Sequence, residues 1–261
     1  MVTDEPLPIT EHLRELRGRI VKILIGWAIG TALAWGFKEQ IFGFLVEPAV
    51  ITLGPEGGKL QAIAPTEVFF TYVKCALLAG FMLSVPVVFW QIWAFVSPGL
   101  YPTEKRAIVP FVTCSSALFI GGSVFGYTAV FPLMFNFFTG FDSEFVQSAW
   151  TMREVFSLTA RLFLVFGVAF ELPVLVFFLS VSGIVSSRQL LKGTPYAVLL
   201  VFVAGAILTP PDPVSQVLLA LPMLVLYLLG VGVAWIFDGR RRRRNARVEK
   251  ASAGEGATQL E

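Results

Sequence analysis

Long runs without a charged residue constrain this chain more than any other feature of its sequence. There are six such runs, of 15 to 35 residues, and Glu171 is the only charge within any of them. About 20 apolar residues cross a bilayer whose hydrocarbon core is roughly 30 Å thick. The sequence therefore predicts an all-α integral membrane protein with six transmembrane helices. The expected spans are about residues 20–37, 72–95, 107–138, 156–180, 194–209 and 214–236.

The composition excludes several classes of function. Hydrophobic residues make up 56% of the chain and charged residues 15%, against roughly 25% charged in soluble domains. One histidine, His12, and two cysteines in apolar runs leave no ligand set for zinc, haem or an iron–sulfur cluster. The sequence also contains no nucleotide-binding or hydrolase motif. We expect no enzyme activity, no catalytic residue, no metal, no cofactor and no nucleic-acid partner.

Basic residues set the expected orientation of the spans. With both termini in the cytoplasm, 15 of the 20 Lys and Arg residues fall on the cytoplasmic side, in agreement with the positive-inside rule. The 35-residue run after Arg106 is long for one span, but splitting it would move Arg188, Lys192 and the Arg-rich C-terminal segment outside. We therefore expect one long helix at residues 107–138.

The chain is expected to form a single membrane domain, residues 1–237. Apolar residues recur at helical spacing over residues 9–21, which predicts an amphipathic cytoplasmic helix. This segment also carries acidic residues, so we interpret it as mature protein and not as a cleavable signal peptide. Residues 238–261 are Arg-rich and then small and polar, which predicts a disordered cytoplasmic tail.

Two further patterns concern the packing of the helices. The fifth and sixth helices are expected to be short, and the 16 residues of the fifth extend about 24 Å, less than the hydrocarbon core. The pairs Gly26/Gly30 and Gly122/Gly126 have the four-residue spacing that permits close approach of membrane helices.

Glu171 is the most informative single position. A carboxylate near the middle of an apolar helix costs about 2.5 to 3.5 kcal/mol on insertion scales. Three roles would explain Glu171 at this position: a protonated side chain used only in packing, a docking point for another membrane helix, or a step in a proton path. Lys74 and Arg161 lie near the outer ends of their helices, where snorkelling explains both.

Other polar residues have simple structural explanations when taken singly. Asp212 stands where it would cap the last helix, and Gln216, four residues later, is expected to make an interhelical hydrogen bond. Glu15 precedes Arg19 by four residues, which favours an ion pair within one helix. Glu104 lies in a short charged turn and would be an ordinary loop charge.

Four segments of the chain together resemble the TatC family, the six-helix core subunits of the twin-arginine protein translocase. They occur in order and at fitting separations between about His12 and Phe237. The segments are HLRELRGRI at 12–20, QIWAF at 91–95 with EKR at 104–106, FGVAFELP at 166–173, and LTPPD at 208–212 with SQ at 215–216.

The resemblance implies a function and a set of site residues. It implies a cup-shaped bundle in the bacterial inner membrane that binds twin-arginine signal peptides at its cytoplasmic face, through Glu15 and Glu104 with Arg17 and Phe95 beside them. An arginine fork meets a carboxylate in two parallel bonds.

The resemblance also implies partners. The single-span subunits TatA and TatB would dock at a polar groove, and folded cargo would cross on the proton-motive force without ATP. Membrane lipid and further copies of the chain are expected in the complex. The polar residues assigned to the groove are Gln91, Glu171, Asp212 and Gln216.

An alternative function is a proton-coupled transporter or channel for a small solute, with Glu171 as the proton carrier. The chain has no detectable internal repeat and no matching pair of broken helices, which argues against it. A purely structural scaffold would bind partners without preferring arginine pairs.

Overall fold

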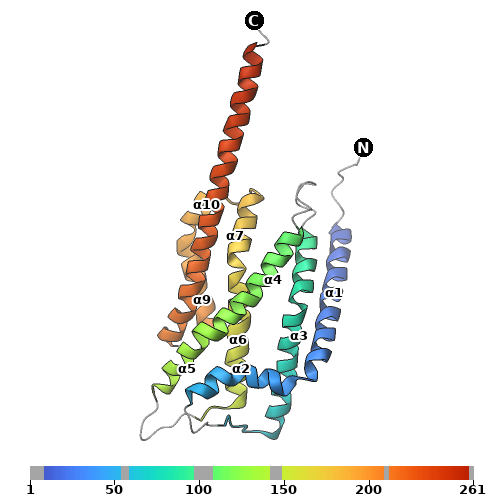
Figure 1. The fold of residues 1–261 in the computed structure, drawn as a ribbon, viewed down its shortest axis with the longest axis vertical. Coiled ribbons are helices and arrows are strands. Elements are labelled where there is room, and N and C mark those ends of the chain that lie inside the picture. The colour runs from blue at the N-terminus through green and yellow to red at the C-terminus, as the bar shows by residue number, and fades with distance from the viewer. Residues whose placement is uncertain (1–8, 54–58, 97–107, 142–148, 209–211, 259–261) are drawn as a thin grey trace. The chain divides into compact units, whose positions relative to one another are not determined.

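The computed structural model describes residues 9–53, 59–96, 108–141, 149–208 and 212–258, and these are almost entirely helical (Figure 1). Five helices are long and apolar enough to cross a membrane, and Thr194–Ile207 is a shorter apolar helix. The all-α membrane fold is thus confirmed. Of the two helices expected to be short, the fifth has 15 residues, whereas the apolar part of the sixth, Pro213–Phe237, has 25.

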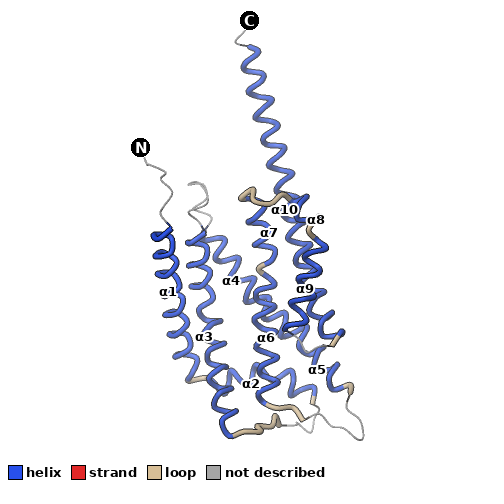
Figure 2. Tube along the Cα trace, turned by 180° about the vertical axis from the view of Figure 1, so that it is seen from behind, coloured by secondary structure: helices blue, strands red, loops and turns tan. Residues whose placement is uncertain are grey.

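The chain divides into two compact units, residues 1–168 and 169–261, and each is described by itself. In the first unit, α1 (Ile9–Trp35) and α3 (Pro65–Val96) lie side by side and run in opposite directions. The amphipathic N-terminal segment is continuous with the first span in α1. Seen from behind in Figure 2, α2 (Lys38–Thr52) lies crosswise at the end where α1 and α3 are connected.

The helix α2 lies between the first two expected spans, in residues 38–71, where the sequence predicted no helix. Glu39 and Glu47 interrupt its apolar residues, so no long uncharged run reveals it. The helix nevertheless buries Leu45 against Cys75 of α3 and Phe156 of α6 (Met152–Phe170). It therefore covers one end of the first unit and buries Leu45, Val46 and Ala49 along one side.

Two glycines bring α1 and α3 into backbone contact. A Cβ atom on Gly30 would stand 2.6 Å from the carbonyl oxygen of Gly80, and a Cβ on Gly80 would stand 2.6 Å from the Cα of Thr31. Neither distance is tolerable for real atoms, so both positions require glycine. Small residues drive close helix approach in membranes because they allow extensive van der Waals packing. This contact fixes the register of the two helices.

The third membrane-spanning run is continuous but changes its winding. It passes from α4 (Ile108–Phe125) through a π-helical turn, Gly126–Val130, into α5 (Phe131–Thr139). Pro132 lacks the N–H that an α-helix would need at this point, and the wider turn precedes it directly. A Cβ on Gly126 would stand 2.6 Å from the Phe166 ring, so this glycine also serves close packing, as its spacing predicts.

A single carboxylate connects the start of α3 with the start of α6 (Met152–Phe170). Glu67 Oε2 accepts a hydrogen bond from the backbone N–H of Ile63 at 2.9 Å, and Oε1 accepts one from the N–H of Arg153 at 2.9 Å. The N–H of Met152 also donates to the carbonyl of Gln61 at 2.8 Å. The first turns of α3 and α6 therefore lie at the same level.

The second unit contains α7 (Leu172–Val181), α8 (Ser187–Lys192), α9 (Thr194–Leu208) and α10 (Pro213–Thr258). Helix α7 packs on α10, where a Cβ on Gly230 would stand 2.9 Å from the Cα of Pro173. The hydroxyl of Tyr227 donates to the carbonyl of Leu190 at 2.7 Å and ties α8 to α10.

The Arg-rich C-terminal segment differs from its prediction. Residues 238–258, expected to belong to a disordered tail, continue α10 as helix up to Thr258. Arg, Ala, Glu and Lys are good helix formers, and a helix already formed by the last span adds residues without a new nucleation step. Composition alone underestimated this continuation.

We predict that Gly80→Ala destabilises the protein, because the added methyl group would meet the backbone of Thr31, which cannot rotate away. Overpacking of this kind costs about 1–3 kcal/mol or more. Gly121→Ala is the matched control, since nothing lies within 4 Å of its Cβ position. Thermal unfolding in detergent measures both variants. A melting temperature for Gly80→Ala equal to that of Gly121→Ala would contradict the close contact.

Candidate functional site

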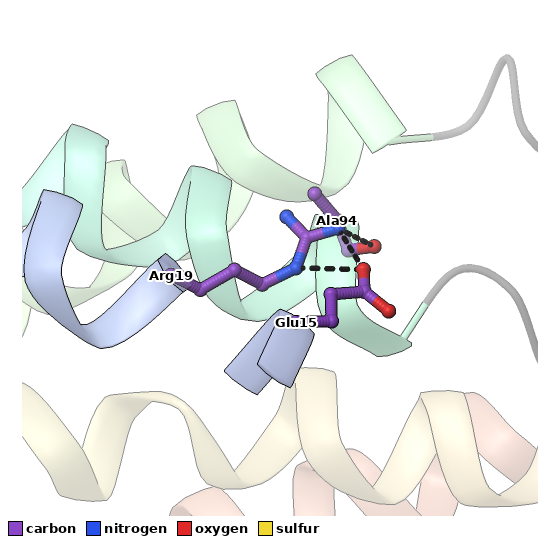
Figure 3. Close-up of polar contacts among 3 residues, drawn as sticks. All are labelled: Glu15, Arg19 and Ala94. Atoms are coloured by element: carbon purple, nitrogen blue, oxygen red, sulfur yellow. Dashed lines mark hydrogen bonds and ion pairs between the residues drawn. The ribbon is translucent and has the colours of Figure 1, made fainter. Parts of the chain in front are cut away.

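A charged cluster joins α1 to the last turn of α3 (Figure 3). Glu15 Oε1 accepts from Arg19 Nε at 3.0 Å and from Arg19 Nη2 at 2.5 Å. The same Nη2 donates to the backbone carbonyl of Ala94 at 3.1 Å. Ala94 lies in the last turn of α3, where carbonyl groups have no partner within the helix. Arg19 therefore holds Glu15 in place and satisfies a helix end at the same time.

Aromatic rings lie one turn away from this cluster. The rings of His12 and Phe95 stack with centroids 4.6 Å apart and an interplanar angle of 26°. Arg17 is exposed on α1 and makes no ion pair within the described part of the chain. Glu104 lies outside the described residues. The structure thus brings Glu15 and Phe95 to one end of the α1–α3 pair, with Arg17 on the neighbouring surface of α1.

The cluster is accessible and weakly held. The Glu15 side chain is 34% exposed and that of Arg19 20% exposed. Exposed ion pairs four residues apart contribute only about 0.3–0.5 kcal/mol. An incoming guanidinium can therefore share or displace this pair at little cost, and it would find a flat aromatic stack beside it on which to lie.

Two residues of this end, Arg19 and His12, were not among the predicted site residues. Arg19 was considered only as the partner of Glu15, because its bond to Ala94 depends on how α1 and α3 align. The sequence signal for His12 was its status as the only histidine, within the predicted N-terminal helix. Nothing in the sequence pairs it with Phe95, which lies 83 positions later.

A second polar group lies at the start of α10. Asp212 Oδ1 accepts from the N–H of Ser215 at 2.7 Å and so caps the helix. Gln216 Nε2 donates to the carbonyl of Phe202 in α9 at 2.8 Å, which is the interhelical bond expected of an amide within a span. A Cβ on Gly205 would stand 3.2 Å from Gln216 Cγ, so the absence of a side chain there leaves room for the amide.

Polar atoms beside Gln216 remain without partners. Asp212 Oδ2 and Ser215 Oγ are buried and make no hydrogen bond to any described residue. Leaving a buried polar group unsatisfied costs about 1–3 kcal/mol. The start of α10 therefore holds two buried oxygens whose hydrogen bonding is incomplete among the described residues.

Glu171 does not join this group. Glu171 is half-buried at the break between α6 and α7, just before Pro173. Pro173 contacts Gly230 of α10, which is 14 residues beyond Gln216, or about 21 Å along the helix axis. Gln91 is half-buried in α3 of the first unit. Of the four residues assigned to one groove, Glu171 and Gln216 thus lie at separate positions within the second unit.

The chain is similar to a defined family over most of its length. The sequence profile described as "Sec-independent protein translocase protein (TatC)" matches residues 11–222. Sec-independent protein translocase protein TatC of Desulforapulum autotrophicum is 42% identical over 91% of this chain and 88% of that protein. The TatC protein of Escherichia coli K12 is 37% identical over 94% of each chain.

A solved structure has the same fold. A crystal structure of a twin-arginine translocase receptor, TatC, superimposes with a TM-score of 0.78 and is 34% identical in sequence. The match covers 86% of this chain and 98% of the solved chain.

Proposed function

The chain belongs to the TatC family of Sec-independent protein translocase proteins, and we propose that it is the subunit that receives twin-arginine signal peptides. TatC is a multi-pass protein of the bacterial inner membrane and a protein-transport component, not an enzyme. It works in a Tat complex with other subunits. The solved relative is itself described as a twin-arginine translocase receptor.

One observation carries the proposal. Glu15 presents a partly exposed carboxylate beside the end of α3, held there by Arg19 and flanked by the His12–Phe95 stack. Arginine offers a planar fork to a carboxylate and stacks on rings, whereas lysine is a point charge. A pair of arginines therefore suits this surface better than a pair of lysines. In this proposal Glu104 supplies the second carboxylate and Arg17 borders the site.

The orientation of the protein follows from the same function. Signal peptides are made in the cytoplasm, so the end of the α1–α3 pair that carries Glu15, and with it the start of α1, faces the cytoplasm in this proposal. The even number of expected spans puts both termini on that side. The distribution of basic residues supports this orientation. Folded cargo would then cross on the proton-motive force.

The polar groups of the second unit suit partner helices. Gln216 uses its Nε2 within the chain, and Asp212 Oδ2 and Ser215 Oγ beside it have no partner among the described residues. We propose that the single-span subunits TatA and TatB dock at this start of α10, and that Glu171 contacts a partner helix at a different depth. Interhelical hydrogen bonds in membranes contribute about 0.6 to 2 kcal/mol each.

We predict that signal-peptide crosslinking depends on both carboxylates. Glu15→Gln or Glu104→Gln should lower labelling by a twin-arginine peptide in membranes about tenfold or more, since one charge-assisted bond contributes about 1.5–3 kcal/mol. Glu11→Gln, an exposed acid on the same helix, should leave labelling unchanged. A twin-lysine peptide should label the unaltered protein weakly. Equal labelling in all cases would refute the receptor function.

A second prediction concerns the polar groups in the spans. Gln216→Leu and Glu171→Ala should reduce photocrosslinking to the partner helices, because each removes a hydrogen-bonding group. Glu171→Gln keeps a hydrogen-bonding group without charge and should retain both crosslinking and cargo transport. Loss of transport in Glu171→Gln with crosslinking intact would instead favour a proton-carrying role for this carboxylate.

A further inference from the structure

An open groove lies between α1, α3 and α6 of the first unit. It has a volume of about 540 Å³, and its apolar wall includes Trp27, Leu77, Phe81 and Leu164. Nothing in the proposed function uses it. Two basic residues, Lys74 and Arg161, also line it.

The walls of the groove are fixed by contacts within the unit. The indole Nε1 of Trp27 donates to the carbonyl of Leu77 at 2.8 Å, and the rings of Trp27 and Phe81 meet edge to face with centroids 6.1 Å apart. Behind them, Leu78 packs with Phe156 in a buried cluster. The groove is therefore preformed, as ligand sites generally are.

The two basic side chains have no counter-charge in the described part of the chain. Both are exposed, and neither makes an ion pair with any described acidic residue. The remaining lining residues are apolar except for Ser157. Cations in an otherwise apolar membrane surface need an anion or water, so the groove is complementary to a molecule with a negative group and a hydrophobic body.

Lys74 and Arg161 lie at the same depth. Each is nine residues from the first residue of its helix, Pro65 or Met152, or about 13.5 Å along the axis. The two helix starts are at one level because Glu67 bonds to the N–H of Arg153.

This depth corresponds to the boundary between headgroups and hydrocarbon. Helix α3 has 32 residues and is about 48 Å long, roughly 18 Å longer than the hydrocarbon core. If both ends project equally, the Cα of Lys74 lies only about 5 Å inside the hydrocarbon, within snorkelling reach of lipid phosphates. Leu77, Phe81 and Leu164 follow three to seven residues further along their helices, towards the membrane interior.

We propose that this groove is a binding site for an anionic phospholipid, with its phosphate on Lys74 and Arg161 and an acyl chain along Leu77, Phe81 and Leu164. The order of charge and apolar surface matches the order of headgroup and chain. Snorkelling to the membrane surface explains each cation singly, but it does not require two cations at the same depth or a groove beside them. The site does not depend on signal-peptide binding.

Native mass spectrometry of the purified full-length protein tests the site. Phosphatidylglycerol and phosphatidylcholine are added separately to the protein in detergent, and the fraction carrying one lipid is measured. We expect a phosphatidylglycerol adduct that weakens about tenfold or more in Lys74→Gln/Arg161→Gln, since two charge-assisted contacts are lost. Lys59→Gln/Arg153→Gln, two exposed cations outside the groove, is the matched control and should bind as the unaltered protein does.

Two results would overturn the proposal. The first is equal binding of the two lipids, or equal binding by both double variants, which would indicate nonspecific adsorption. The second comes from a photocrosslinker at Leu77 in native membranes: an adduct of protein size would identify the occupant as a partner helix. An adduct of phospholipid mass, lost in Lys74→Gln/Arg161→Gln, supports the site.

Discussion

The contact between Gly30 and Gly80 is the constraint on which the first unit depends. Because α1 and α3 run in opposite directions, fixing them at this point determines which residues of the two helices face each other along the rest of their length. Glu15 lies 15 residues before Gly30 and Phe95 lies 15 residues after Gly80, so both are about 22 Å from the crossing. The Arg19–Ala94 bond and the His12–Phe95 stack are consequences of this register. A packing contact deep in the span thus assembles the proposed peptide site at the end of the pair.

The bilayer limits the hydrogen-bond partners of polar groups within the spans. Polar groups there cannot bond to water, so their partners must be groups of the same chain or of another molecule in the membrane. Asp212 caps α10 with one carboxylate oxygen, and its other oxygen has no partner among the described residues. The side-chain amide of Gln216 donates a hydrogen bond to the carbonyl of Phe202 in α9. Pro173, two residues after Glu171, contacts Gly230, which lies 14 residues beyond Gln216 on α10. Glu171 and Gln216 therefore offer contacts at two different depths of the second unit.

Much of the fold could be predicted because charge placement alone marks the apolar runs. The close approach of Gly30 and Gly126 also followed from spacing, but their partners Gly80 and Phe166 did not, since no sequence pattern encodes which helices meet. Helix α2 was not predicted because Glu39 and Glu47 interrupt its apolar residues, so it contains no long uncharged run. The π-helical turn before Pro132 was not predicted either, because it depends on the one backbone N–H that proline lacks. For the site, the Glu15–Arg19 pair was expected, whereas the role of Arg19 as a positioning residue at Ala94 required the register.

The central claim is that Glu15 bonds directly to an arginine of the signal peptide. A double-mutant cycle tests it most directly. The unaltered protein and Glu15→Gln are each placed in nanodiscs, and their affinities are measured for three peptides. These are a twin-arginine peptide and two peptides in which one or the other arginine is replaced by glutamine. The account predicts a coupling energy of about 1.5 kcal/mol or more with one of the two arginines. Additive effects, within about 0.5 kcal/mol for both arginines, would contradict it.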